Sequence, residues 1–329
     1  MKKKSIILSF DYELFFGFHS GTVMKSIIEP TNLLLDSMER NGLHGNFFID
    51  YLMFKYLELI QEQCAQNDLK LLKGQVRDMV RRGHRIELHL HPHWIDAKYN
   101  GDGTWNYSNF THYSLSSLDE DTIIGMFKEG ADYLNALARE EIPDYTICAF
   151  RAGGWAVQPF DKIRRGFLAA GIKIDSSVAA GMYGSNQYSY FDFTSAPQSE
   201  SWSFENDVCK EHDGGQFIEI PITTVKRTFF NKVADLLMRK TTSKLTKITD
   251  GTHNRSDIAT TKKQKISNNS MMTFSGHSPL TVVLNLLSIK SSLCVLIDHP
   301  KDFTMSNKLS IQWLGRLTTS TTYKDYLRQ

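Results

Sequence analysis

The sequence predicts an α/β protein built on a parallel sheet, either doubly wound or closed into a barrel. Short β-type runs alternate with amphipathic helical patterns through most of the 329 residues, which is typical of βαβ units. Hydrophobic residues make up 41% of the chain, and a chain of this length buries most of its apolar surface without disulfides or structural metals. Length alone favours roughly two domains, although one α/β barrel with insertions also fits.

Each element has its own signal. The apolar run at 5–10 predicts a buried first strand. Pro30 predicts the start of the first helix and Gly42 its end, because Pro suits the first helical turn and Gly the C-terminal cap. Short apolar runs like the one at 5–10 predict further strands at 45–49, 85–88, 145–150, 172–174, 217–222 and 293–297. Helical patterns of apolar residues predict helices at 51–61, 69–82, 118–139, 160–170 and 280–289.

Composition and turn chemistry exclude several classes of protein. The 38 Lys and Arg residues against 36 Asp and Glu leave a net charge of +2, which argues against a general nucleic-acid binder. The cysteines are far apart, which indicates reduced thiols rather than a zinc cage or a disulfide framework. Asp11 and Glu13 follow the first strand where a nucleotide-binding turn needs glycines, which argues against a dinucleotide site or a P-loop.

The sequence also carries signals about location. No apolar run approaches the ~20 residues of a membrane span. Lys2, Lys3 and Lys4 resemble the start of a signal peptide, but the apolar stretch ends at Asp11, short of the roughly 7–15 residues that an export signal needs. We therefore expect a cytoplasmic protein, or one that acts at the inner face of a membrane through a partner.

A polar, basic insertion is expected at about 239–270. Lys and Arg greatly outnumber the acidic residues there. A solvated insertion is the plainer interpretation. The alternative is a basic lid that recognises an anionic substrate or an anionic membrane surface.

Ionisable residues follow the ends of several predicted strands. In parallel barrels and open α/β sheets, loops converge at the carboxyl edge of the strands and form the site there. Taken singly, each residue has a structural explanation, such as a helix cap or a tight turn. Five groups at one edge of the sheet favour a functional site. The groups are Asp11 with Glu13, the histidines at 89–93, Arg151, Asp175 and His299.

The histidine cluster predicts a metal ion. His89, His91 and His93 lie within five residues, and core packing does not explain three imidazoles at that spacing. Imidazole and carboxylate are the usual ligands of a catalytic zinc ion, and acidic residues are available at Asp11 and Glu13. The donor types alone leave zinc, cobalt, nickel and iron open.

Together these residues resemble the polysaccharide deacetylases, the NodB-homology group or carbohydrate esterase family 4. Five runs occur in the family's order: SFDYE at 9–13, GHRIELHLHPH at 83–93, FRAGGW at 150–155, DSS at 175–177 and LIDH at 296–299. The second run is the most specific and matches the family's second motif nearly unaltered. The resemblance spans about residues 5–300 and implies a distorted (β/α)7 barrel that forms one domain over 1–329.

The resemblance implies a metal site. His89 and His93 match the two metal-binding histidines, and His91 has no family role. Tyr12 stands where the family has a ligating aspartate, so the resemblance implies that Glu13 coordinates the metal instead.

The resemblance also implies the catalytic groups. Asp11 matches the general base and Arg151 the arginine that orients it, while His299 resembles the general acid and Asp175 the aspartate that supports it. The third run departs from the family's Arg-x-Pro-Tyr, and a backbone N–H near Gly154 or Trp155 would serve the oxyanion.

The implied function is a metal-dependent hydrolase, most readily a zinc enzyme, that removes an N-acetyl or N-formyl group from an amino sugar of a cell-surface polysaccharide or lipopolysaccharide pathway. The expected substrate is an acylated amino sugar or a saccharide precursor, nucleotide- or lipid-linked, since no export signal is recognised. Two alternatives stay open: an amidohydrolase of small linear or cyclic amides, and a catalytically degenerate barrel that binds metal or glycan.

Overall fold

The computed structural model describes residues 3–17, 19–226, 228–229, 233–237, 247–253 and 269–328. The predicted basic insertion at 239–270 falls mostly outside these residues. Among the described residues, none of the helices combines the length and the apolar character that crossing a membrane requires.

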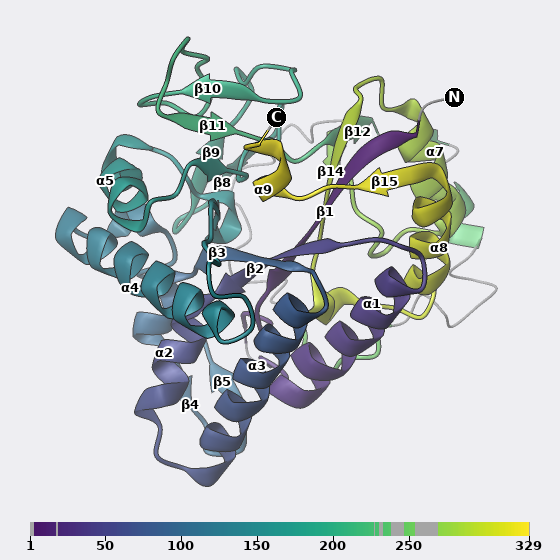
Figure 1. Ribbon diagram of the computed structural model, residues 1–329. Coiled ribbons are helices and arrows are strands. Elements are labelled where there is room, and N and C mark those ends of the chain that lie inside the picture. Colours follow the sequence, from purple (N-terminus) through teal and green to yellow (C-terminus); the bar gives the residue numbers. More distant parts are fainter. Residues whose placement is uncertain are drawn as a thin grey trace.

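A nine-stranded, mostly parallel sheet forms the centre of the molecule (Figure 1). Its order is β10-β11-β7-β6-β3-β2-β1-β14, and β15 also pairs with β1. Only the β10–β11 pair within this sheet is antiparallel. The strands are β1 (Lys4–Tyr12), β2 (Gly45–Asp50), β3 (Arg85–Leu90), β6 (Ala149–Ala152), β7 (Ile174–Asp175), β10 (Trp202–Phe204), β11 (Phe217–Glu219), β14 (Leu293–Asp298) and β15 (Thr318–Ser320).

Helices cover the outside of this sheet (Figure 1). Polar residues that cap helix starts explain some of their bounds: Asp119 accepts a hydrogen bond from the Thr122 N–H, and Ser278 accepts one from the Thr281 N–H. The helices are α1 (Glu29–Glu39), α2 (Tyr51–Leu59), α3 (Gln63–Arg81), α4 (Glu120–Arg139), α5 (Asp161–Ala170), α7 (Pro279–Ser288), α8 (Asn307–Leu317) and α9 (Tyr323–Tyr326). In the described residues, three two-stranded antiparallel sheets lie outside the large sheet: β4 (Lys98–Tyr99) with β5 (Trp105–Asn106), β8 (Tyr183–Ser185) with β9 (Tyr190–Asp192), and β12 (Thr224–Lys226) with β13 (Asn269–Met271).

Irregular segments close the curled sheet into a distorted barrel. The N–H of Ile222 donates to the carbonyl of Val178, just beyond β7, and the N–H of Thr223 donates to the carbonyl of Val295 in β14. Met272 adds a further link: its N–H donates to the Thr223 carbonyl, and its carbonyl accepts a hydrogen bond from the Ile297 N–H. The predicted α/β fold, a distorted barrel, is confirmed.

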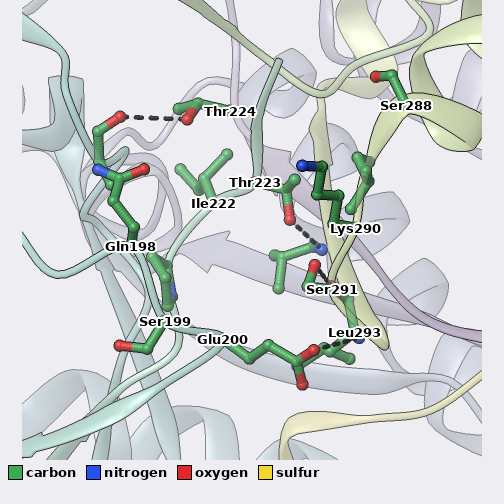
Figure 2. A pocket seen from close by; sticks show the side chains of 14 residues that line it. Gln198, Ser199, Glu200, Ile222, Thr223, Thr224, Ser288, Lys290, Ser291 and Leu293 are labelled. Atoms are coloured by element: carbon green, nitrogen blue, oxygen red, sulfur yellow. Dashed lines mark hydrogen bonds between the residues drawn. The ribbon is translucent and has the colours of Figure 1, made fainter.

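The seam of the barrel contains a polar pocket of about 250 Å³ at the amino end of β14 (Figure 2). Glu200 enters it and accepts hydrogen bonds from the N–H and hydroxyl of Ser292 and from the N–H of Leu293. Leu293 begins β14, whereas His299 directly follows its last residue. This pocket therefore lies at the end of the strand opposite to the predicted catalytic residues.

Alternation along the strands creates two cores. Ile6, Leu8 and Phe10 of β1 belong to the large core that includes the helices. Ile7 belongs to a small inner core together with Phe48 and Val295. Since successive side chains of a strand point to opposite faces, Ser9 and Asp11 share the inner face with Ile7. Because side chains alternate along each strand, polar residues at the carboxyl ends of the strands point into the barrel.

Candidate active site

The site lies where several parallel strands end. Strand register places Asp50 beside His89, His89 beside Arg151, and Phe10 beside Asp298. The side chains of Asp11, Glu13, His89 and Arg151 are all buried there. His299 is 21% exposed and forms the solvent-facing side of the group.

Asp11 and Arg151 form a buried ion pair. The Arg151 Nη1 lies 2.7 Å from Asp11 Oδ1. Other bonds hold the guanidinium in place: its Nε donates to the Ser176 carbonyl and its Nη2 to the Ser9 hydroxyl. Burial favours the neutral form of Asp11, but Arg151 and the neighbouring histidines outweigh it and lower the pKa of this carboxyl. Asp11 is therefore ionised, and its Oδ2 is left facing His299.

Glu13, His89 and His91 converge on one point. The Glu13 Oε2 lies 3.1 Å from His89 Nε2 and 2.6 Å from His91 Nε2. One ligand atom from each of these residues lies within 4.8 Å of the others, so the group could bind a metal ion. Burial acts against ionisation of Glu13, but Lys301 and the two histidines hold its pKa well below the ordinary value.

The donor chemistry of this group fits a divalent transition metal. The His89 Nδ1 lies 2.6 Å from the Arg151 carbonyl oxygen, which aims Nε2 at Glu13. Burial lowers the pKa of His89, but Asp11 and Glu13 raise it more, to about 9, so a proton sits on Nε2. A metal ion would replace that proton, because imidazole ligates through a deprotonated nitrogen. Burial lowers the pKa of His91 to about 4 and keeps that ring neutral.

The structure places His91, rather than the expected His93, in this group. His93 packs among aromatic rings, with centroids 4.2 Å from Phe16 and 5.0 Å from Tyr107. Both of its ring nitrogens are buried and have no hydrogen-bond partner in the described residues. The chain turns into a short 3-10 helix at Pro92, so the spacing of an extended strand does not continue to His93. His91 lies at the strand end and keeps the inward orientation of His89.

Lys301 is a site residue that the sequence analysis missed. Its Nζ lies 2.7 Å from Glu13 Oε1 and donates to the Leu14 carbonyl, and its side chain is only 2% exposed. The ammonium group therefore holds one oxygen of Glu13, and the histidines contact the other. The sequence signal was available: Lys301 closely follows His299 after the end of a predicted strand.

His299 stands beside both carboxylates. Its Nε2 lies 3.6 Å from Asp11 Oδ2 and 3.5 Å from Glu13 Oε1. On the other side of the ring, Nδ1 lies 3.7 Å from Asp302 Oδ2. Asp302 also contacts Lys247 and His253, and these cations contribute to its pKa lying below the ordinary range although burial opposes this.

Asp175 is not brought to His299. Its carboxylate accepts hydrogen bonds from the N–H and hydroxyl of Ser177, and its strand partner in β11 is Glu219. Burial and the charge of Asp175 raise the pKa of Glu219 well above the ordinary value, so Glu219 carries a proton beside Asp175. Asp302, three residues after His299, is the carboxylate that the structure places near Nδ1.

Asp50 is a second residue that the sequence analysis missed. It ends β2 on the inner face, and its Oδ2 accepts a hydrogen bond of 2.6 Å from the Trp94 indole N–H. Burial raises the pKa of Asp50 to about 7, against the opposing effect of His89. Its Oδ1 is buried without a hydrogen-bond partner in the described part of the chain. The alternation of side chains along β2, which places Asp50 on the inner face, was the signal that could have identified this residue.

Two glycines after Arg151 make room for aromatic rings. A Cβ on Gly153 would lie 2.5 Å from His91 Nδ1, and one on Gly154 would lie 2.7 Å from the Tyr113 hydroxyl. Gly154 also has a φ of 58°, in the left-handed region that favours glycine. The glycines of the run FRAGGW thus leave the space that the His91 ring occupies. Its role in binding an oxyanion stays a prediction.

Comparisons with known proteins give similar folds at low sequence identity. No family model and no curated protein matches the sequence. A 4-α-glucanotransferase from Thermococcus litoralis matches with a TM-score of 0.53 and 12% identity, over 100% of this chain and 41% of that one. This chain therefore spans well under half the length of the glucanotransferase.

Two further structures are, by name, a deacetylase and a carbohydrate esterase. A peptidoglycan N-acetylglucosamine deacetylase matches with a TM-score of 0.44 and 12% identity, over 98% of this chain and 88% of that one. A family 4 carbohydrate esterase from Streptomyces lividans, in complex with acetate, matches with a TM-score of 0.41 and 11% identity, over 95% and 87%. At these identities the similarity concerns the fold alone: this chain is a distorted (β/α) barrel, the fold that its resemblance to the polysaccharide deacetylases implies.

Proposed function

We propose that this chain is a metal-dependent hydrolase that removes an N-acetyl or N-formyl group from an amino sugar. One observation carries the proposal: His299 Nε2 lies within 3.6 Å of Asp11 and of Glu13, so a proton donor, a proton acceptor and a metal-ligand group meet at one strand edge. Hydrolysis of an amide needs a base for water and an acid for the departing amine.

Asp11 acts as the general base. Arg151 occupies its Oδ1, which leaves Oδ2 to accept a proton from water. The lowered pKa keeps this carboxylate ionised at neutral pH. Because Arg151 is fixed by Ser9 and Ser176, the acceptor oxygen has a defined position before substrate binds.

His299 acts as the general acid. It is the partly exposed member of the group, so a substrate entering from solvent reaches it first. Its Nε2 donates a proton to the nitrogen that leaves the acyl group, and Asp302 contacts the ring on the Nδ1 side and orients it.

Glu13, His89 and His91 would hold the metal ion, with zinc as the best fit to two imidazoles and one carboxylate. When bound, such an ion supplies Lewis-acid chemistry, acidifying water and polarising a carbonyl oxygen. Lys301 fixes the orientation of Glu13 through its second oxygen, as outer partners of ligands commonly do.

The substrate class follows from the resemblance and from the partial exposure of His299. An acylated amino sugar, carried on a nucleotide or a lipid, is the proposed substrate, and a cytoplasmic location stays a prediction. The experiment is acetate and formate release from N-acylated amino sugars, with and without added zinc. The wild type should turn over at least one sugar, while Asp11→Asn and His299→Gln should lose that activity. Release that persists after a chelator has removed all bound metal, or full activity of Asp11→Asn, would disprove the proposal.

Lys301 favours a second candidate, a barrel that binds glycan without turnover. Its ammonium group already provides a cation beside Glu13. Elemental analysis separates the two functions: about one equivalent of metal supports the hydrolase, whereas no bound metal after zinc addition supports the binding protein.

A further inference from the structure

Helices α7 and α8 present an apolar face that the proposed reaction does not use. Leu280 and Leu284 of α7 and Leu309 and Trp313 of α8 are exposed, and so is Leu236 of the nearby segment 233–237. The first four line a hollow of about 770 Å³, together with Val233 and other apolar side chains of the same segment. We call Leu280, Leu284, Leu309 and Trp313 the leucine–tryptophan face. Figure 1 shows α7 and α8 on one side of the barrel. An exposed apolar patch with such a hollow commonly marks a binding surface.

The charged residues on α8 and just after α7 are all basic. Residues 269–297 and 303–324 contain no Asp or Glu, and the cations Lys290, Lys308 and Arg316 lie on or beside α7 and α8. The Arg316 guanidinium lies 5.3 Å from the centroid of the Trp313 ring, so a cation stands directly at the apolar surface.

The nearest carboxylates are already paired. Asp235 accepts hydrogen bonds from the Ser278 N–H and the Thr281 hydroxyl and contacts His277, so its charge is directed at the start of α7. On α1, which packs against α8, Asp36 and Glu39 contact Arg82. Among the described residues, the face therefore combines exposed leucines and a tryptophan with the cations Lys308 and Arg316 of α8.

We propose that the leucine–tryptophan face docks the protein on an anionic lipid membrane. Apolar side chains enter the boundary between headgroups and acyl chains, Trp favours that boundary, and Lys and Arg are attracted to anionic headgroups. The face also lies close to the site in the chain, because α8 begins shortly after His299 and the short helix Pro300–Asp302. Docking through it would bring the carboxyl edge of the barrel near the lipid surface. This inference does not depend on the proposed hydrolysis.

The test is co-sedimentation of the full chain with vesicles of phosphatidylcholine, alone or mixed equally with phosphatidylglycerol. The wild type should bind the mixed vesicles at least tenfold more tightly, and raised salt should weaken that binding. The combined variant Leu280→Gln, Leu309→Gln and Trp313→Gln should bind at least tenfold more weakly than the wild type. These side chains are 59%, 46% and 39% exposed, so folding is retained, as circular dichroism can verify.

A matched control replaces equally exposed apolar residues elsewhere, Leu59→Gln, Ile142→Gln and Leu168→Gln, which are 66%, 43% and 43% exposed. It should bind vesicles like the wild type. Equal loss in the control, or no preference of the wild type for anionic vesicles, would overturn the proposal. A wild-type dimer that the α7–α8 variant converts to monomer would also overturn it and assign the face to a second copy of the chain. No hydrolysis is measured, so failure here leaves the proposed reaction untouched.

Discussion

The guanidinium of Arg151 and the carboxylate of Asp11 form an ion pair inside the barrel, 2.7 Å apart, with Arg151 fully buried. Four segments far apart in sequence meet there, because Arg151 of β6 also contacts Ser9 of β1, Ser176 after β7 and Tyr323 of α9. Since Lys has a single nitrogen on a flexible stem, it cannot reproduce this set of contacts.

Arg151→Lys should therefore lower kcat by on the order of a hundredfold. It should also raise the pKa of Asp11, because Arg151 is the strongest of the neighbours that lower it. The measurement is the pH profile of kcat/KM, whose acidic limb should move to higher pH. An unchanged profile with a reduced rate would mean that Arg151 has only a structural role.

His91 and His93 should respond differently to substitution. His91→Ala removes a group whose Nε2 lies 2.6 Å from Glu13 and should abolish tightly bound metal, as should His89→Ala. His93→Phe keeps an aromatic ring among Phe16 and Tyr107 and should retain about one equivalent. Elemental analysis of the purified variants checks this. Metal lost in His93→Phe and kept in His91→Ala would restore the ligand set expected from the sequence.

Lys301→Met should destabilise the protein. The substitution leaves Glu13 buried without its ammonium partner, and breaking a buried ion pair typically costs about 3–5 kcal/mol. Urea unfolding of the metal-free protein measures the loss. Saturating zinc should restore part of it, since ligation again compensates the charge of Glu13. A change within about 0.5 kcal/mol would show that Lys301 contributes no stability.

Gly153→Ala should disturb the metal group although no ligand is replaced. The new Cβ would lie 2.5 Å from His91 Nδ1 and 2.7 Å from the Leu90 carbonyl, so His91 must move. Metal affinity should fall by roughly 10–100-fold, the usual effect of a displaced outer partner. The matched control is Gly74→Ala in α3, where a Cβ meets nothing within 4 Å. That change should leave metal binding intact and raise stability by roughly 0.5–1 kcal/mol. Titration with zinc compares the two.

His84 should make stability depend on pH. It is buried and accepts a hydrogen bond from the Gly45 N–H, and burial lowers its pKa from 6.5 to about 4. Between these values the unfolded chain binds more protons than the folded one, so stability falls as the pH falls. From pH 7 to pH 5 the loss should be about 2 kcal/mol. His84→Asn keeps an acceptor for Gly45 and should lose less over the same interval, as urea unfolding at both values measures. Identical slopes in the two proteins would contradict this assignment.

The sequence predicted the strands and helices around the site well. β1, β2, β3 and β14 cover the runs predicted at 5–10, 45–49, 85–88 and 293–297, because buried parallel strands are continuous apolar runs. The prediction was less accurate at 145–150, because the strand begins only at Ala149. Tyr145 lies outside the strand and donates its hydroxyl to a β3 carbonyl. The strands β10 and β15 were not predicted, because each is three residues long and carries no period.

Some site residues can be identified from local sequence patterns, whereas others depend on contacts between residues far apart in the chain. Asp11, Glu13, His89, Arg151 and His299 lie at strand ends, so local patterns identify them. The choice of His91 over His93 depends on where the strand turns at Pro92. The contact of Lys301 with Glu13 joins residues 288 positions apart, and no local pattern encodes such a pairing.

The central strand β1 has both of its outer partners at the far end of the chain. Ser5 to Phe10 pair with β14, and Lys4 to Ile6 pair with β15. During synthesis the ribosome would release the first half of the barrel long before these partners exist. Until then one edge of β1 stays uncovered, and Asp11 meets His299 only after β14 has been synthesised. Contacts of such high sequence separation fold slowly. Folding of this barrel is therefore expected to be slow, because β1 stays incompletely paired until β14 and β15 are available.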